Sequence, residues 1–428
     1  MSVEEIIAES WYPSGIATAL VEAEGAPAGI AIFRMSTRWG THDLFHPTSS
    51  PQDSQWWSEV TSNPGWWGES PDISSAEITE FPADGKAWKV KWDDSGPAGW
   101  SGQAVEIRCL PLDGHGHGKV LAEVDSNNLL SAIGGLQFAG RDILVILPEP
   151  EHPSALEVIS ELVREEDEAG LNYLATRLGQ TLGAFATTIK PKNHHPYTQR
   201  IWNDRLKKLE DWSKANTLWR APHSVETQGT ITHRNIGLEV MHIGPDELRI
   251  SGCYDGLFNA ITGLQQNNPA IRDLASLFTS LSEHLNRLDG QRYEEGMRKA
   301  ILAAWSASAP ERWSRPRALD THRGGVTIWE YEQRLEGLVF AHAWNRDVAP
   351  TTRVWLAKVS RLQASMFGDR IWAALSLVCW SGAVIITALW LDGGISNVVA
   401  VAAPPLLFAG FGLRRLYHSR ARPPWLPL

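Results

Sequence analysis

The sequence has 428 residues, a formal net charge of −10 and 21 tryptophans. A chain of this length can bury two or three hydrophobic cores. A protein this acidic is repelled by phosphate backbones, so its composition argues against nucleic acid as a partner. It has only three cysteines, which is typical of a reducing compartment and argues against a disulfide framework.

Residues 1–125 are predicted to form a β-rich region, a cap or N-terminal lobe. Many of the tryptophans fall here and favour a packed core over a sugar-stacking cleft. The two histidines of His115 to Gly118 (HGHG) have no further ligands nearby, which favours a flexible loop over a metal site. The segment 46–72 is expected to be irregular. Segments rich in β-branched or aromatic residues and bounded by turn residues are 15–24, 28–36, 75–81, 86–94 and 102–112.

Residues 126–346 are predicted to be mostly helical. A strand-rich piece, 229–256, interrupts the helices and has a hairpin turn at Gly244 to Asp246. A β-rich region followed by a helical region with an embedded hairpin predicts an α+β fold with two lobes, as in kinases. Segments in which apolar residues recur three and four apart are 155–170, 171–189, 199–216, 270–288, 293–307 and 327–345.

Residues 371–413 are predicted to form a transmembrane hairpin. Ile371 to Leu391 and Ile395 to Leu413 contain no charged residue. About 20 apolar helical residues cross a hydrocarbon core of about 30 Å, and a pair of buried core helices would each have a polar face. Pro404 and Pro405 are expected to kink the second span. The hairpin makes the lipid bilayer an expected partner.

The charges beside the hairpin predict its orientation. Residues 347–370 form a basic juxtamembrane segment, residues 414–428 form a basic tail, and the turn at Asp392 carries only negative charge. Short basic loops stay on the cytoplasmic side, and the first ten residues lack the apolar core of a signal peptide. We therefore expect a plasma-membrane protein with two spans and with both termini in the cytoplasm.

Five segments between residues 156 and 345 resemble, in order, motifs of maltokinase and the related aminoglycoside-phosphotransferase kinases. Pro269 to Leu281 (PAIRDLASLFTSL) is similar to their PLRDVAGMLRSL helix. The other segments are Arg177 to Thr187 (similar to LGRxLAxLHxxL), Ile231 to Val240 (VHGDLHLGQV), Leu248 to Gly256 (VVIDFEG) and Trp329 to Asn345 (a late helix with a Tyr-Glu pair). The hairpin is not part of that family's usual architecture.

The resemblance implies a role for each position of the phosphotransfer site. The catalytic-loop Asp falls on Asn235, the magnesium-binding amide on Val240 and the metal-binding Asp on Cys253. Asparagine cannot accept a proton near neutral pH, valine has no lone pair, and a soft sulfur suits magnesium poorly. His233 is retained, but that histidine is usually structural. The replacements predict a degenerate, pseudokinase-like site without a cofactor.

A shifted alignment gives the alternative. Asp255 becomes the metal ligand if the hairpin contains a two-residue bulge, and Glu239 then supplies a carboxylate near the loop. ATP and magnesium would bind in that case. Lys89 and Lys91 are weak candidates for a lysine that pairs with the nucleotide, although alternating lysines are typical of a solvated strand face. A chance match to an unrelated α/β domain is a further hypothesis.

Three functional hypotheses follow. The leading one is a membrane-anchored, catalytically degenerate kinase-like protein that acts as a scaffold or regulator for an unknown protein partner at the cytoplasmic face. The first alternative is an active, ATP-dependent sugar kinase of maltokinase type. The second is an accessory subunit of a membrane complex, in which small residues at 381–383 and 409–412 pack against partner helices.

Overall fold

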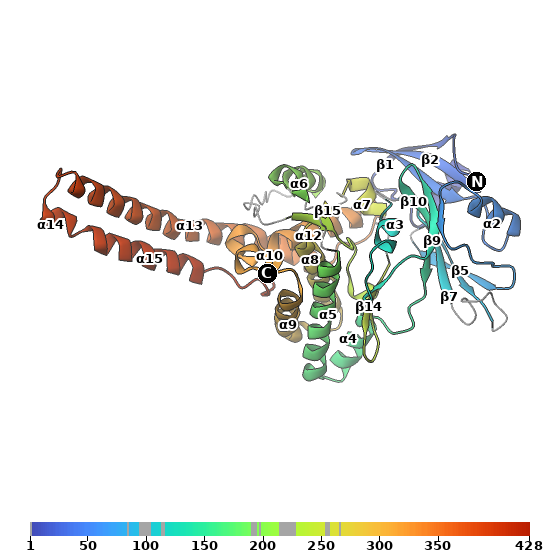
Figure 1. Ribbon diagram of the computed structural model, residues 1–428. Helices are drawn as coiled ribbons and strands as arrows, with labels where there is room; N and C mark the ends of the chain where they lie inside the picture. The colour runs from blue at the N-terminus through green and yellow to red at the C-terminus, as the bar shows by residue number, and fades with distance from the viewer. Residues whose placement is uncertain are drawn as a thin grey trace.

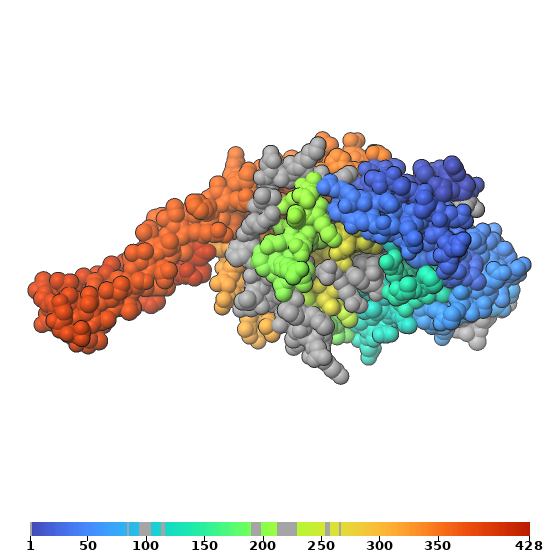
Figure 2. Space-filling view, turned by 90° about the horizontal axis from the view of Figure 1, so that it is seen from above, coloured from blue at the N-terminus to red at the C-terminus, as the bar shows by residue number. Residues whose placement is uncertain are grey.

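The computed structural model describes residues 2–428 except 84, 94–103, 113–115, 190–194, 197, 214–227, 253–256 and 265–266. The described chain forms a β-rich part, a helical part and a projecting helical hairpin (Figure 1). In the space-filling view the hairpin extends as an arm from one end of the body, and the N-terminal β-rich part lies at the opposite end (Figure 2). The expected order of a β-rich N-terminal region and a helical C-terminal region is therefore confirmed.

The β-rich part contains two antiparallel sheets and three short helices. The smaller sheet has the order β1-β2-β3, and the larger has the order β4-β9-β10-β7-β6-β5. The strands of the smaller sheet are β1 (Ala17–Ala23), β2 (Ile30–Thr37) and β3 (Gly40–Pro47). Those of the larger sheet are β4 (Trp66–Gly68), β5 (Glu77–Ala83), β6 (Gly85–Lys91), β7 (Ala104–Cys109), β9 (Gly134–Phe138) and β10 (Arg141–Pro148). The helices are α1 (Val3–Ala8), α2 (Ser54–Thr61) and α3 (His117–Ala122).

Tryptophans fill the core of the β-rich part, as expected. Trp56 and Trp57 of α2 pack with Trp88 of β6 and with apolar residues of both sheets. The indole N–H groups of Trp56 and Trp57 donate to backbone carbonyls, to Gly29 O at 2.7 Å and to Pro71 O at 3.2 Å. A buried indole whose N–H is satisfied contributes a large apolar surface at no polar cost.

Two features of the β-rich part differ from expectation. The segment 46–72 contains α2 and β4 and is not irregular throughout. The strand-rich part also extends past residue 125, because β9 and β10 complete the large sheet up to Pro148. Strand β10 has both faces covered, so it is a continuous apolar run and lacks the alternation by which half-buried strands are recognised.

The helical part is built on long helices around the largest hydrophobic core. Its main helices are α4 (Ala155–Arg164), α5 (Glu168–Thr188), α6 (Gln199–Ser213), α8 (Ala270–Arg287), α9 (Glu294–Ser308) and α12 (Thr327–Ala343). The shorter ones are α7 (Leu257–Thr262), α10 (Glu311–Ser314), α11 (Pro316–Leu319) and the 3₁₀ turns η1 (Leu238–Val240), η2 (Gln291–Tyr293) and η3 (Thr321–Arg323). Short strands form two further sheets, β11 (His195–Pro196) with β12 (Gln228–Ile231) and β15 (Asn267–Asn268), and β13 (Met241–Ile243) with β14 (Leu248–Ser251) and β8 (Leu129–Leu130).

Two glycines explain how α5 packs against α9. A Cβ at Gly179 would lie 2.3 Å from the carbonyl oxygen of Ile301, and one at Gly183 would lie 2.7 Å from the Cβ of Ser308. Glycine in a helix interior costs about 1 kcal/mol relative to alanine, so its use here reflects the close approach of the two helices. Both glycines belong to the RLGQTLGAF segment that the sequence identified as a motif.

The hairpin consists of α13 (Pro350–Leu391), α14 (Asn397–Ala400) and α15 (Ala403–Ser419). The first half of α13 packs on the body through Trp355, Val359, Leu362 and Met366. Beyond it, most of the large apolar side chains are exposed. By length and composition, both candidate spans, 350–391 and 397–419, could cross a membrane: each contains an 18-residue window of high mean hydropathy, 2.0 in the first and 1.4 in the second.

The second apolar segment is broken, where a kink was expected. The helix is interrupted at Val401 and Ala402, and Pro404 and Pro405 lie in the first turn of α15, where backbone N–H groups have no helical partner. The small residue Gly410 packs against Trp380 of α13, within the hairpin itself.

The C-terminal residues do not extend away from the body. Lys358 Nζ donates to Leu428 O at 2.7 Å, Arg298 Nε to Trp425 O at 2.8 Å, and Thr321 Oγ1 to Arg422 O at 2.6 Å. The segment expected to form a basic tail is therefore docked on the helical part, and both ends of the hairpin meet the same end of the body (Figure 1).

Candidate functional site

The candidate site is the loop between β12 and η1, which contains Thr232, His233, Arg234 and Asn235. Asp273 in the first turn of α8 fixes its backbone: Oδ2 accepts the N–H of His233 at 2.8 Å, and Oδ1 accepts that of Arg234 at 3.1 Å. Burial raises the pKa of Asp273 to about 6, although the two N–H donors and the neighbouring Arg272 favour the anion. The carboxylate that holds the loop is therefore ionised at neutral pH.

Arg234 adopts a backbone conformation that is unusual for its residue type. Its φ is +68°, in the left-handed region, and its side chain is buried. The family motif VHGDLHLGQV has glycine at this position, which reaches this conformation without a Cβ penalty. A non-glycine residue held there costs on the order of 1–3 kcal/mol and persists only when its surroundings determine it. Here the Arg234 N–H is held by Asp273, and its carbonyl accepts Arg272 Nη1 at 3.0 Å.

His233 has the environment of a structural histidine. Its Nε2 lies 3.1 Å from Ser251 O and 2.5 Å from Gly252 O, so it donates to the end of β14. Burial lowers the pKa of His233 to about 4, and the ring is neutral at physiological pH. The histidine thereby joins the candidate loop to the segment that follows β14.

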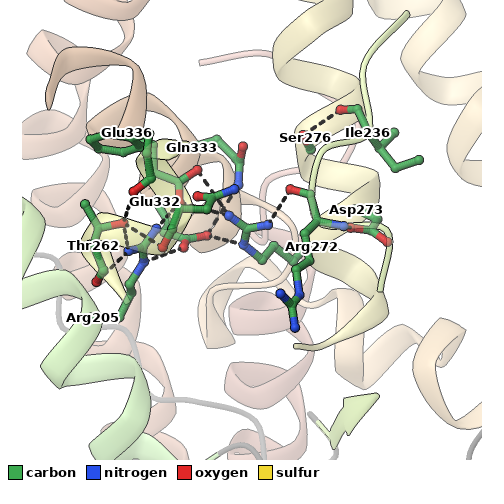
Figure 3. A network of polar contacts seen from close by, with 12 residues as sticks. Arg205, Ile236, Thr262, Arg272, Asp273, Ser276, Glu332, Gln333 and Glu336 are labelled. Carbon is green, nitrogen blue, oxygen red and sulfur yellow. Dashed lines mark hydrogen bonds and ion pairs between the residues drawn. The ribbon is translucent and has the colours of Figure 1, made fainter. Parts of the chain in front are cut away.

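A buried ion network supports the loop from behind (Figure 3). Arg272 donates from Nε to Glu332 Oε2 at 2.8 Å and from Nη2 to Glu336 Oε1 at 2.9 Å. Arg205 of α6 contacts the same two carboxylates, and its Nη1 donates to Thr262 O at 3.2 Å. Two cations and two anions therefore join α6, α7, α8 and α12, and Arg272 connects this network to the loop through the carbonyl of Arg234.

The Tyr-Glu pair of the late helix belongs to the same framework. Burial by itself would raise the pKa of Glu332, but Arg272 and Arg205 outweigh it and the pKa is lowered. Tyr331 donates its hydroxyl to Glu210 of α6 at 3.0 Å. The residues that carry the family resemblance in α8 and α12 are thus buried and form the support of the loop.

The positions to which the motif resemblance assigns chemistry are less buried than this supporting framework, or lie outside the described residues. The side chain of Asn235 is exposed, and Val240 in η1 packs against the large core. Cys253 and Asp255 lie outside the described residues. The carboxylate of Glu239 is exposed and folds over Gly237, where an added Cβ would lie 2.3 Å from its Oε1. Within the described ranges no three His, Cys, Asp or Glu side chains are grouped to hold a metal ion.

The two candidate lysines lie on an exposed strand face. Lys89 pairs with Glu149 at the surface, with half of its side chain accessible, and Lys91 is exposed on the same face of β6. An exposed pair of this kind contributes little to binding or stability. The surroundings of both lysines are those of a solvated strand face.

Sequence reasoning missed a cation on the central strand β7. Arg108 lies opposite Val145 in the pairing of β7 with β10. The side chain of Val145 belongs to the large hydrophobic core around which the helical part is built. Arg108 and its partner Glu106 therefore face the helical part, with side chains 15% and 20% exposed. Val105 to Arg108 has the spacing of the V-A-I-K strand motif of protein kinases, with arginine in place of lysine. This spacing is the sequence feature from which Arg108 could have been predicted.

A second missed residue is His117, at the start of α3. It was expected in a flexible loop, but it is fully buried and lies beside the backbone of Thr232 and His233. Burial lowers the pKa of His117 well below its usual range, and the positive charge of Arg234 adds to the effect. His117 thus lies at the contact between the β-rich part and the candidate loop.

Comparison with known proteins identifies the fold. The sequence matches no protein-family model and has no significant match among curated proteins. A glucosamine kinase in complex with glucosamine, ADP and inorganic phosphate has a TM-score of 0.50 at 12% identity, over 85% of this chain and 99% of that chain. Its crystal form A gives 0.50 at 13% identity, over 81% and 91%. A choline kinase from Cryptosporidium parvum Iowa II gives 0.40 at 9% identity, over 70% and 92%. The chain has a kinase-like phosphotransferase fold.

Proposed function

We propose that the protein is a membrane-anchored, catalytically degenerate kinase-like protein that acts as a scaffold or regulator. The observation that carries this proposal is the contrast within the candidate loop. The residues that shape the loop, among them His233 and Asp273, are buried and hydrogen-bonded. The positions for the base and for one magnesium ligand hold Asn235 and Val240.

These two replacements bear directly on phosphoryl transfer. The reaction depends on magnesium to neutralise phosphate charge and on a carboxylate to orient the attacking hydroxyl. The asparagine amide takes up no proton near neutral pH, and the packed valine offers no oxygen to a metal. Arg108, if it pairs with phosphate as the kinase lysine does, supplies charge but replaces neither of these groups.

The hairpin supports the membrane part of the proposal. Val378 is 66% exposed, Phe408 77% and Leu391 74%, so large apolar side chains on both arms of the hairpin face water. A bilayer would cover this surface, and the docked C-terminal residues place both ends of the hairpin on the side of the body. With basic flanks on that side, the body would face the cytoplasm.

Phosphotransfer by the full chain in lipid nanodiscs tests the catalytic part of the proposal. With ATP, magnesium and a panel of sugars that includes glucosamine and maltose, we expect no sugar phosphate, and we expect no magnesium-dependent rise in melting temperature with ATP. Sugar phosphate formation that Asp255→Ala abolishes would refute the proposal.

The alternative is an active sugar kinase. It is favoured by the extent of the fold similarity, which covers 99% of a glucosamine kinase chain bound to glucosamine and ADP. Glu239 beside the loop is a candidate acid for such a site. The assay above separates the two hypotheses, because the alternative requires turnover that depends on Asp255.

Anchoring is tested by a charge in the first span. Val384 is 65% exposed on α13, and arginine at the centre of a span costs about 3 kcal/mol of insertion free energy. We expect Val384→Arg to shift the full chain from the alkali-resistant membrane fraction toward the soluble fraction. Val21→Arg, at a β1 position that is 55% exposed, is the matched control. Equal recovery of all three proteins in the soluble fraction would refute anchoring.

A further inference from the structure

A pocket lies where the hairpin meets the body. It has a volume of about 950 Å³ and three walls: α9, the segment from α10 to η3, and the docked C-terminal residues. Figure 1 places α10 and the C-terminus at the end of the body from which the hairpin projects. The third wall follows α15 directly in the chain, so the pocket lies beside the end of the second candidate span.

The lining combines apolar surface with an excess of positive charge. Leu302, Leu319 and Trp425 contribute apolar groups. The lining contains four lysine and arginine residues, Lys299, Arg317, Arg323 and Arg422, together with His418, against one carboxylate, Asp320. That carboxylate already accepts the N–H of His322 at 2.9 Å as a helix cap. A ligand of this pocket therefore meets net positive charge beside an apolar wall.

Two of these cations have contacts that bear on ligand binding. Lys299 Nζ lies over the ring of Trp425, 5.8 Å from its centroid. Arg422 donates from Nη2 to Pro427 O, and its Nε has no hydrogen-bond partner among the described residues. Burial lowers the pKa of the Arg422 guanidinium, which indicates that this cation is partly removed from water. A buried N–H without an acceptor is costly and is satisfied when an anion binds.

We propose that this pocket binds one anionic phospholipid from the membrane in which the hairpin lies. The inference rests on the proposed anchoring, which would place the pocket at the cytoplasmic surface of the bilayer. Basic pockets beside membrane helices on that side bind anionic headgroups. The phosphate meets the four cations, and the glycerol and upper acyl carbons cover Leu302, Leu319 and Trp425. A volume of this size lies at the upper end of small-ligand sites, which suits a headgroup with part of its chains.

Native mass spectrometry of the full chain in a neutral detergent tests the proposal. Phosphatidylglycerol and phosphatidylcholine with identical chains are titrated in parallel. We expect one phosphatidylglycerol to bind at least about tenfold more tightly than phosphatidylcholine. Ala303→Trp fills the pocket from an exposed position on α9 and is expected to abolish this binding.

A second variant and a matched control guard against misfolding. Arg317→Gln combined with Arg323→Gln leaves the pocket open and is expected to weaken phosphatidylglycerol binding by about tenfold or more. Arg353→Gln combined with Arg415→Gln removes two exposed cations near the hairpin that do not line the pocket, and it should bind as the unmodified protein does.

Several outcomes would overturn the proposal. Equal binding of the two lipids would do so, and so would unchanged lipid binding in both pocket variants. Displacement of the lipid by glycerol phosphate or inorganic phosphate at the same concentration would also overturn it, because it would identify a site for free phosphate. A copurified peptide in the pocket would also contradict it. Alkaline extraction of membranes reports insertion of the hairpin separately, so a failure of anchoring is distinguishable from a failure of lipid binding in detergent.

Discussion

Two sets of residues at and around the candidate loop differ in how the protein holds them. One set shapes the loop: His233, Asp273, Arg272 and Glu332 are buried and joined by hydrogen bonds and ion pairs. The other set, Asn235 and Val240, occupies the positions to which the motif resemblance assigns chemistry: Asn235 is exposed, and Val240 packs against the large core. At this site, the residues that determine conformation are separate from the residues at those assigned chemical positions.

This difference has an energetic basis. A buried, hydrogen-bonded ion network loses several kcal/mol when one partner is removed, whereas an exposed polar side chain contributes little to stability. Substitution at the chemical positions is therefore tolerated by the fold, and substitution in the supporting network is not. The following predictions test whether the two sets are as separable as the structure indicates.

The largest effect is expected from Arg272→Met. The change leaves Glu332 and Glu336 with Arg205 as their one cationic partner in the network, and it removes the donor to the carbonyl of Arg234. Breaking a buried pair in this way costs about 3–5 kcal/mol of unfolding free energy. Urea unfolding of the full chain in detergent measures the loss. Arg292→Gln, which breaks an exposed pair with Glu166, is the control and should cost at most about 1 kcal/mol.

Asp273→Asn is expected to have an intermediate effect. The amide oxygen can accept one of the N–H groups of His233 and Arg234, and the anion that faces Arg272 is lost. Removal of a charged hydrogen-bond partner costs about 1.5–3 kcal/mol. The same unfolding experiment measures it. A loss smaller than that of Arg292→Gln would mean that the loop does not depend on this carboxylate.

The pH dependence of stability is expected to be smaller, and its sign follows from two opposing groups. The pKa of His233 falls from 6.5 to about 4 on folding, so the unfolded chain binds its proton first and stability decreases as the pH drops below 6.5. This contributes about 1 kcal/mol of destabilisation between pH 6.5 and 5.5. The pKa of Asp273 rises from 3.8 to about 6, so the folded chain binds that proton first and acid stabilises it between those values.

The two variants therefore change the pH profile in opposite directions. We expect Asp273→Asn to steepen the acid-induced loss of stability between pH 6.5 and 5.5, because the compensating group is gone. His233→Gln should flatten it. Urea midpoints measured across this pH range provide the test. If the midpoint had the same pH dependence in both variants, the opposite pKa shifts of His233 and Asp273 would be contradicted.

The sequence predicted the supports better than the site. The 3.6-residue periodicity and the RDLASL segment placed α8 and α12 correctly, since a buried helix face leaves a regular apolar pattern. The ion network was not predicted, because Arg205, Arg272 and Glu332 come from three helices that meet only in the folded chain. Strand β10 was missed because burial on both faces removes alternation. His117 was assigned to a flexible loop because the sequence around its HGHG segment offers no further metal ligands, and the backbone of the candidate loop that buries it is more than a hundred residues away in the chain.

The smallest effect on stability, and the sharpest test of separability, is expected from Asn235→Asp. Asn235 is exposed and the new carboxylate can remain in water, so the unfolding free energy should change by less than about 0.5 kcal/mol. The restored acid alone should not produce sugar phosphate, because Val240 still offers no ligand to magnesium. Phosphotransfer with ATP, magnesium and sugars measures this outcome, with Asn203→Asp at a half-buried position of α6 as the control. If Asn235→Asp gains activity while Asn203→Asp does not, a working metal site must already be present beside the loop, and the chemical positions would be one substitution away from function.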